Sequence, residues 1–174
     1  GSCFLDGTEL EPLSARRMAK LCSYIPQRSG ISIDMSVLDV VLMGFHPYLR
    51  ILEYPTVSMK QSAVDALKYV GLSGKEQDNY LHLSEGQKQL CILARTMVSD
   101  ARLLLLDEPE SALDFRCRYR MLDIIQKRIL EMNGGAIVTL HDPVLALNYC
   151  DKLVLLWNGT VLDILFPQEE PLER

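Results

Sequence analysis

Residues 103–109 read Leu-Leu-Leu-Leu-Asp-Glu-Pro, four leucines followed at once by two acids and a proline. A short continuous apolar run is typical of a strand that is buried on both faces of a parallel sheet. Open α/β sheets bind ligands just outside the carboxyl ends of their strands. We therefore expect Asp107 to approach a Mg²⁺ ion and Glu108 to activate a water. For these two residues alone, a solvated acidic turn is the alternative.

Two further strands are expected to end at the same edge. Residues 136–140 form an apolar run after a helix expected over residues 116–132, and residues 21–25 form another that Pro26 stops. Repeated strand–helix units imply a parallel sheet. Such a sheet would bring His141 and Gln27 to the edge that carries Asp107 and Glu108. There His141 could hold a phosphate oxygen or the attacking water, and Gln27 could donate to a phosphate or a metal-bound water. A capping or packing role for His141 and a plain turn role for Gln27 are the alternatives.

Between these strands the pattern becomes helical. Ser36 is expected to cap a short helix that ends at Gly44. A second helix is expected from about Thr56 or Ser58 to Gly71, with an apolar face at helical spacing. Near the C-terminus, Asn158-Gly159 between two apolar runs predicts a β-hairpin.

A third helix is expected to open with Ser84-Glu85-Gly86-Gln87, which has the Ser-x-x-Gln form of a capping box. Its expected apolar face is Leu90, Ala94, Met97 and Val98. The free backbone N–H groups and the positive helix end also suit an anion. A capped helix with no ligand explains the same residues equally well.

Composition narrows the class of protein. The 174 residues are 48% hydrophobic, which fits one globular domain, and a net charge of -5 with pI 5.2 gives no reason to expect nucleic acid. Five scattered cysteines lack metal-site spacing and predict reduced thiols. No apolar run approaches the roughly 18 residues that span a bilayer. A membrane link would therefore go through a partner protein.

Taken together, the motifs resemble those of the ATP-binding cassette (ABC) ATPases. In order and spacing they match the family's Q-loop, signature, Walker B strand, D-loop and switch histidine, at Gln27, residues 83–87, residues 103–108, residues 111–114 and His141. The resemblance covers residues 1–164. Residues 36–44 and 47–49 are further similar to the importers of iron-siderophores, haem and cobalamin, although Phe45 stands where those proteins usually carry a basic residue.

The resemblance implies the fold and the partners. It implies a partial α/β nucleotide-binding domain over residues 1–174, with the parallel-sheet core of P-loop NTPases at about 1–28 and 101–166. A helical subdomain is expected at about 29–100. ATP and Mg²⁺ are the implied cofactors, and transmembrane permease subunits and a second ATPase subunit are the implied partners. The expected location is cytoplasmic, on the inner face of the cell membrane and attached through the permease.

The resemblance also implies roles for single residues. Glu108 would be the general base, His141 the γ-phosphate sensor and Asp107 the Mg²⁺ contact. Gln27 would join the metal to the permease. The residues implied to contact nucleotide are Gln27, Ser84, Glu85, Gly86, Gln87 and Asp114.

Two departures from the family pattern carry consequences. Glu85 stands where the signature usually has glycine, which puts a carboxylate beside a phosphate site. No G-x-x-x-x-G-K-[ST] motif occurs, so the phosphate-cradling loop is missing. In the family that loop precedes the stretch that resembles residues 1–7. We therefore expect an N-terminally truncated chain that does not hydrolyse ATP by itself.

Two other functions remain open. One is a non-catalytic module that docks on a permease through the helical segment. The other is an ABC ATPase of DNA maintenance, but that class inserts a long coiled coil between the Q-loop and the signature. Only 56 residues separate Gln27 from Ser84 here, and they contain no sustained heptads.

Overall fold

The computed structural model describes residues 1–167, so residues 168–174 of the expected domain lie outside the described part. The backbone divides into two compact units, of which the first is Gly1–Val138 and the second begins at Thr139. The first unit contains the helical segment and nearly all of the sheet.

The first unit opens with a hairpin and a helix that lead into the sheet. Its first elements are β1 (Phe4–Leu5), β2 (Thr8–Glu9), α1 (Ala15–Leu21) and β3 (Cys22–Ile25). The turn residues Asp6 and Gly7 both have positive φ, as a type I′ hairpin turn requires. The strand expected at residues 21–25 is confirmed with a boundary shift of one residue.

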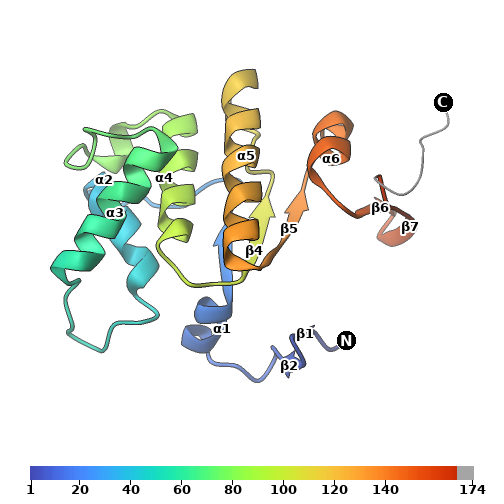
Figure 1. Cartoon of the computed structure of the whole chain (residues 1–174), viewed down its shortest axis with the longest axis horizontal. Helices are drawn as coiled ribbons and strands as arrows, with labels where there is room; N and C mark the ends of the chain where they lie inside the picture. The colour runs from blue at the N-terminus through green and yellow to red at the C-terminus, as the bar shows by residue number, and fades with distance from the viewer. Residues whose placement is uncertain (168–174) are drawn as a thin grey trace. The chain divides into compact units, whose positions relative to one another are not determined.

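Residues 29–100 contain three α-helices and two 3₁₀ turns (Figure 1). That they form a separate subdomain stays a prediction. Ser36, Thr56 and Ser84 cap the three α-helices by accepting hydrogen bonds from backbone N–H groups of the first turn. The elements are α2 (Val37–Leu42), the 3₁₀ turn η1 (Met43–Phe45), α3 (Val57–Val70), the 3₁₀ turn η2 (Tyr80–His82) and α4 (Glu85–Met97). Gly71 ends α3 in the left-handed conformation that glycine favours.

The expected role of Gly44 as a helix stop is wrong. Gly44 lies inside η1, and α2 already ends at Leu42. A Cβ on Gly44 would lie 2.3 Å from the carbonyl oxygen of Arg95 and 2.5 Å from Cγ2 of Val98. Glycine is needed there because α4 passes directly over this backbone.

The expected apolar stripe of α4 is only partly correct. Ala94 is buried, but Leu90, Met97 and Val98 are only half-buried. The buried residues of the helix are Gln89, Cys91, Ile92, Leu93, Ala94 and Thr96. The helix contacts α2, α3, β3 and α5, so it is enclosed on several sides. A helix buried on several sides does not show a single stripe.

The sheet has strand order β3-β4-β5, with β4 at Leu103–Asp107, β5 at Gly135–Thr139 and α5 (Phe115–Met132) connecting them. β3 and β4 are parallel, with Ile25 opposite Leu106, which confirms the predicted parallel α/β sheet. The expectation that these strands are buried on both faces is wrong for the described residues. Leu104 and Leu106 are buried but Leu103 and Leu105 only partly, and Ile137 of β5 is 63% exposed. Burial of both faces needs a packed layer on each side of the strands.

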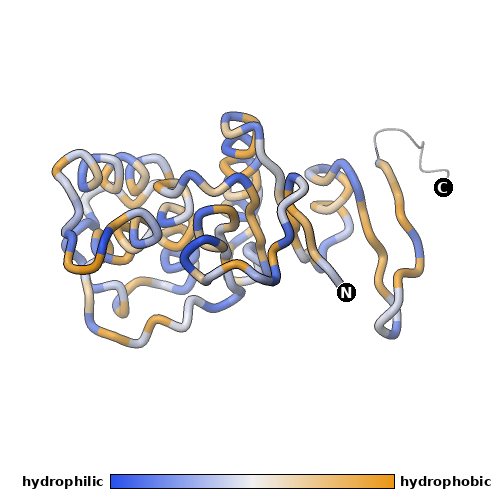
Figure 2. Tube along the Cα trace, turned by 90° about the horizontal axis from the view of Figure 1, so that it is seen from below, coloured by the Kyte–Doolittle hydropathy of each residue, from blue (hydrophilic) through white to orange (hydrophobic). Residues whose placement is uncertain are grey.

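The second unit contains α6 (Pro143–Tyr149) and a hairpin of β6 (Leu153–Trp157) and β7 (Thr160–Leu165). Asn158 and Gly159 both have positive φ, so the predicted hairpin is confirmed. Figure 2 shows apolar residues along both of its strands, with polar residues at the turn. In the described part of the chain, no helix has the length and apolarity to cross a bilayer.

Candidate functional site

The first cluster lies where β3 and β4 end side by side. Because Ile25 is opposite Leu106 in the parallel register, Gln27 and Glu108 leave the sheet at the same edge. The Gln27 Nε2 donates a hydrogen bond of 2.5 Å to the Glu108 Oε2. Glu108 has a φ of 45°, a left-handed conformation that strains a residue with a side chain by about 1–2 kcal/mol. Strain of this kind is often found at functional sites.

Asp107 is the last residue of β4 and is half-buried beside this pair. The Tyr24 hydroxyl donates a long hydrogen bond of 3.4 Å to the Asp107 Oδ2. No group of three or more His, Cys, Asp or Glu side chains that could enclose a metal occurs in residues 1–167. Mg²⁺ commonly takes one or two carboxylates together with waters and substrate phosphates. Asp107, Glu108 and Gln27 carry oxygens of the kind that Mg²⁺ takes in such a shared site.

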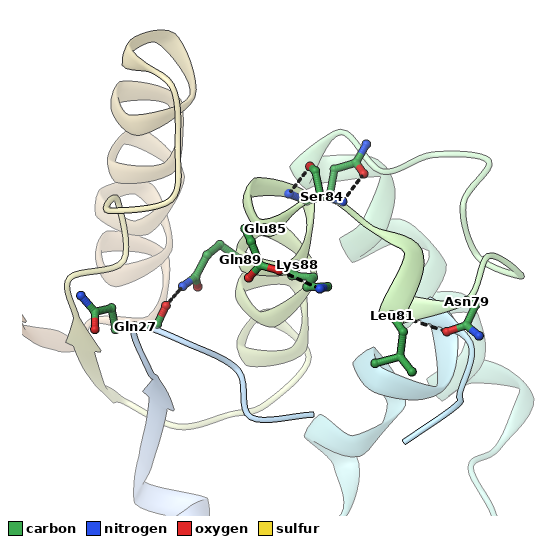
Figure 3. Close-up of polar contacts among 8 residues, drawn as sticks. Gln27, Asn79, Leu81, Ser84, Glu85, Lys88 and Gln89 are labelled. Carbon is green, nitrogen blue, oxygen red and sulfur yellow. Dashed lines mark hydrogen bonds and ion pairs between the residues drawn. The ribbon is translucent and has the colours of Figure 1, made fainter. Parts of the chain in front are cut away.

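The second cluster is the start of α4, where the predicted capping box is confirmed. The Ser84 Oγ accepts from the Gln87 backbone N–H at 3.3 Å, and the Gln87 Oε1 accepts from the Ser84 backbone N–H at 3.1 Å (Figure 3). Exposed Glu85 forms an ion pair of 2.7 Å with Lys88, one turn further along. Its carboxylate is therefore directed along the helix towards a positive charge.

Gly86 joins this cluster to residues 111–114. A Cβ on Gly86 would lie 3.1 Å from Cδ2 of buried Leu113 and 3.4 Å from the carbonyl oxygen of Ala112. The glycine thus lets the start of α4 approach the loop that precedes α5. The motifs at residues 83–87 and 111–114 are neighbours within this chain.

Asp114 caps α5, since its carboxylate accepts from the Cys117 backbone N–H at 2.8 Å. The pKa of Asp114 lies below its ordinary value, and this hydrogen bond is the largest cause. The structure therefore gives Asp114 a helix-capping contact, and its contact with nucleotide stays a prediction.

His141 belongs to the second unit, where it is exposed and precedes the N-cap residue of α6. Its neighbour Asp142 caps that helix and accepts from the Val144 backbone N–H at 2.8 Å. The expected position of His141 beside Glu108 stays a prediction.

Sequence reasoning missed Gln89. This side chain is only 4% exposed, and its Nε2 donates to the carbonyl oxygen of Gln27 at 2.5 Å (Figure 3). It also donates to the carbonyl oxygen of Pro26 at 3.3 Å. Its contacts join α4 to the segment that carries the first cluster. No local signal in the sequence marks Gln89, because its burial depends on the elements packed around α4.

Comparison with known proteins gives consistent results. A model of the family described as "ABC transporter" matches residues 1–111. An iron chelatin transport ATP-binding protein of Helicobacter pylori is 34% identical over 148 residues, which cover 85% of this chain and 58% of the relative. The hemin import ATP-binding protein HmuV of Bordetella pertussis is 34% identical over 167 residues, which cover 91% and 63%. The chain thus spans about three fifths of the length of these relatives.

Solved structures share the fold. A metal-chelate type ABC transporter in an inward-facing conformation matches with a TM-score of 0.77 at 30% identity, over 85% of this chain and 59% of that one. A dimeric ATP-binding cassette in a post-hydrolysis state with ADP and Pi matches with a TM-score of 0.84 at 20% identity, over 96% and 73%. The second likeness concerns the fold alone.

Proposed function

Because the chain belongs to the ABC transporter family, we propose that it is part of the ATP-hydrolysing subunit of an importer for iron-siderophores, haem or cobalamin. The observation that carries the proposal is the hydrogen bond of 2.5 Å between Gln27 and Glu108 at the end of two parallel strands. The names of the relatives, which concern iron chelatin and hemin, support this cargo class.

Glu108 acts as the general base in this proposal. Its carboxylate accepts a proton from the water that attacks the γ-phosphate, and general bases of this kind contribute about 10²- to 10⁴-fold in rate. The Gln27 carboxamide holds one carboxylate oxygen by its hydrogen bond and so orients the base. Asp107 and Gln27 would hold Mg²⁺, which would neutralise charge on the phosphates. His141 contacts the γ-phosphate.

Ser84, Glu85, Gly86 and Gln87 serve a nucleotide held mainly by a second ATPase subunit. Backbone N–H groups at the start of α4 suit an anion, and the Lys88 ion pair reduces the repulsion that Glu85 would exert on it. Asp114 lies in the loop that Gly86 contacts and completes this set.

A permease docks on the helical segment. The loop between η1 and α3 exposes apolar side chains, with Ile51 90% and Tyr54 85% exposed. These two side chains also line a hollow of about 460 Å³. Its other lining residues are Arg16, His46, Leu49, Arg50, Glu53 and Pro55. Exposed apolar patches mark interaction sites. The permease would hold the subunit at the cytoplasmic face of the membrane.

This chain would not hydrolyse ATP on its own. It supplies the groups that act on metal and water, but its sequence has no G-x-x-x-x-G-K-[ST] motif to grip the β- and γ-phosphates. Tight binding of ATP by this chain alone would contradict this part of the proposal.

Transport in cells tests the proposal. Deletion of the gene should abolish uptake of a ferric siderophore, haem or cobalamin, and a plasmid copy should restore it. A copy with Glu108→Gln should not restore uptake. The control is Glu11→Gln, at an exposed acid outside the Gln27–Glu108 cluster, and a copy with this change should restore uptake. Unchanged uptake of all three cargoes after deletion would overturn the cargo class. Full uptake with Glu108→Gln would favour a non-catalytic docking module.

A further inference from the structure

We propose that Gln89 is a positioning residue, which ties the helix that carries residues 84–87 to the Gln27–Glu108 pair. The inference rests on the function proposed above. Gln89 lies outside the cluster of Gln27, Asp107 and Glu108, and it controls the orientation of Gln27 within that cluster.

The geometry of the Gln89 side chain is specific. Gln89 is on α4, and its Nε2 donates to the carbonyl oxygens of two successive residues, Pro26 and Gln27. These two residues form the exit from β3, which ends at Ile25. A carboxamide bound to both carbonyls fixes the direction in which the backbone leaves the strand. Arg95, further along α4, donates to the carbonyl of Tyr24, which lies inside the strand.

The same backbone carries the Gln27 side chain that reaches Glu108. Its carboxamide can meet Glu108 at 2.5 Å only if its own backbone is held in one place. The contacts therefore run from α4 through Gln89 to the backbone of Gln27, and from the Gln27 side chain to Glu108. A shift of α4 would be transmitted to the general base by this route.

Packing alone does not explain a glutamine at this position. The Gln89 Oε1 is buried and has no hydrogen-bond partner among the described residues. Burial of an unpartnered acceptor is unfavourable, whereas methionine would fill a similar volume without it. The two donor contacts are what the carboxamide adds over methionine.

Nuclear magnetic resonance of this chain without nucleotide tests the link. In the Gln89→Met variant, the side-chain amide resonances of Gln27 should move most of the way towards their positions in Glu108→Ala, which removes the acceptor. Thr96→Val is the matched control. It removes another buried hydrogen bond of α4, from the Thr96 Oγ1 to the carbonyl of Leu93, without a contact to Gln27. It should leave the Gln27 side-chain resonances unchanged.

A folded Gln89→Met variant with unchanged Gln27 resonances would overturn the proposal. So would equal shifts in Thr96→Val, which would indicate general loosening of the helix. If Gln89→Met does not fold, a measurement on the unsubstituted chain tests the link instead. A scalar coupling through the hydrogen bond, from the Gln89 Nε2 to the Gln27 carbonyl carbon, is expected, and its absence would overturn the link. Neither measurement needs ATP, so a failure here leaves the proposed ATPase function standing, and a failed uptake test leaves this link standing.

Discussion

The side-chain carboxamide of Gln27 donates a hydrogen bond of 2.5 Å to the Glu108 carboxylate, across 81 positions of sequence. The contact exists because β3 and β4 are parallel neighbours in a register that ends both strands at the same edge. A carboxylate held by a donor in this way gains a defined orientation, which a general base needs.

Loss of the base should separate binding from hydrolysis. We expect Glu108→Gln to retain ATP binding and lose about 10²- to 10⁴-fold in turnover, in a protein that joins this chain to the phosphate-binding segment of a relative. Phosphate release and equilibrium binding of ATP measure the two effects. Glu11→Gln, at an exposed site, should match the parent. Turnover of Glu108→Gln within a few-fold of the parent would show that another group activates the water.

The close approach at Gly44 predicts a large loss of stability. In Gly44→Ala the new Cβ would overlap the carbonyl oxygen of Arg95, which is backbone and cannot rotate away. We expect a destabilisation of about 1–3 kcal/mol, as for other overpacked sites, measured by urea unfolding. Gly135→Ala is the control, since a Cβ there meets nothing within 4 Å. Equal midpoints for the two variants would contradict the close approach.

The cap of α5 predicts a specific pH dependence. The hydrogen bond from the Cys117 backbone N–H lowers the pKa of Asp114 below its unfolded value, about 3.9. The resulting stabilisation is present above that unfolded pKa and is lost as the pH falls through the lower folded pKa. Asp114→Asn keeps a capping oxygen without a charge. Between pH 6 and pH 3, the urea midpoint of unfolding should therefore fall less steeply in Asp114→Asn than in the unsubstituted chain. Parallel plots of midpoint against pH for the two proteins would argue against the cap.

The cysteines should differ sharply in reactivity. Burial raises the pKa of the Cys91 thiol to about 12, so almost no reactive thiolate forms at pH 8. Cys3 is exposed. A chromogenic disulfide reagent should modify Cys3 quickly in the native chain and Cys91 only after unfolding, and Cys91→Ala should remove one slow site. Modification of Cys91 as fast as Cys3, located by mass spectrometry, would mean that α4 opens readily.

Several features followed from the sequence alone because they depend on residues close together in the chain. The capping box needs only Ser84 and Gln87, and the hairpin turn needs only Asn158 and Gly159. The four leucines before Asp107 marked a strand for the same reason. The order of the motifs along the chain then sufficed to identify the family.

The tertiary structure alone decided what depends on distant neighbours. The role of Gly44 follows from the backbone of α4 passing over it, and the contacts of Gln89 follow from where β3 ends. Exposed Ile137 shows that an apolar run fixes a strand but not what covers its faces. Periodicity describes one element at a time, whereas burial and hydrogen bonding depend on the elements packed around it.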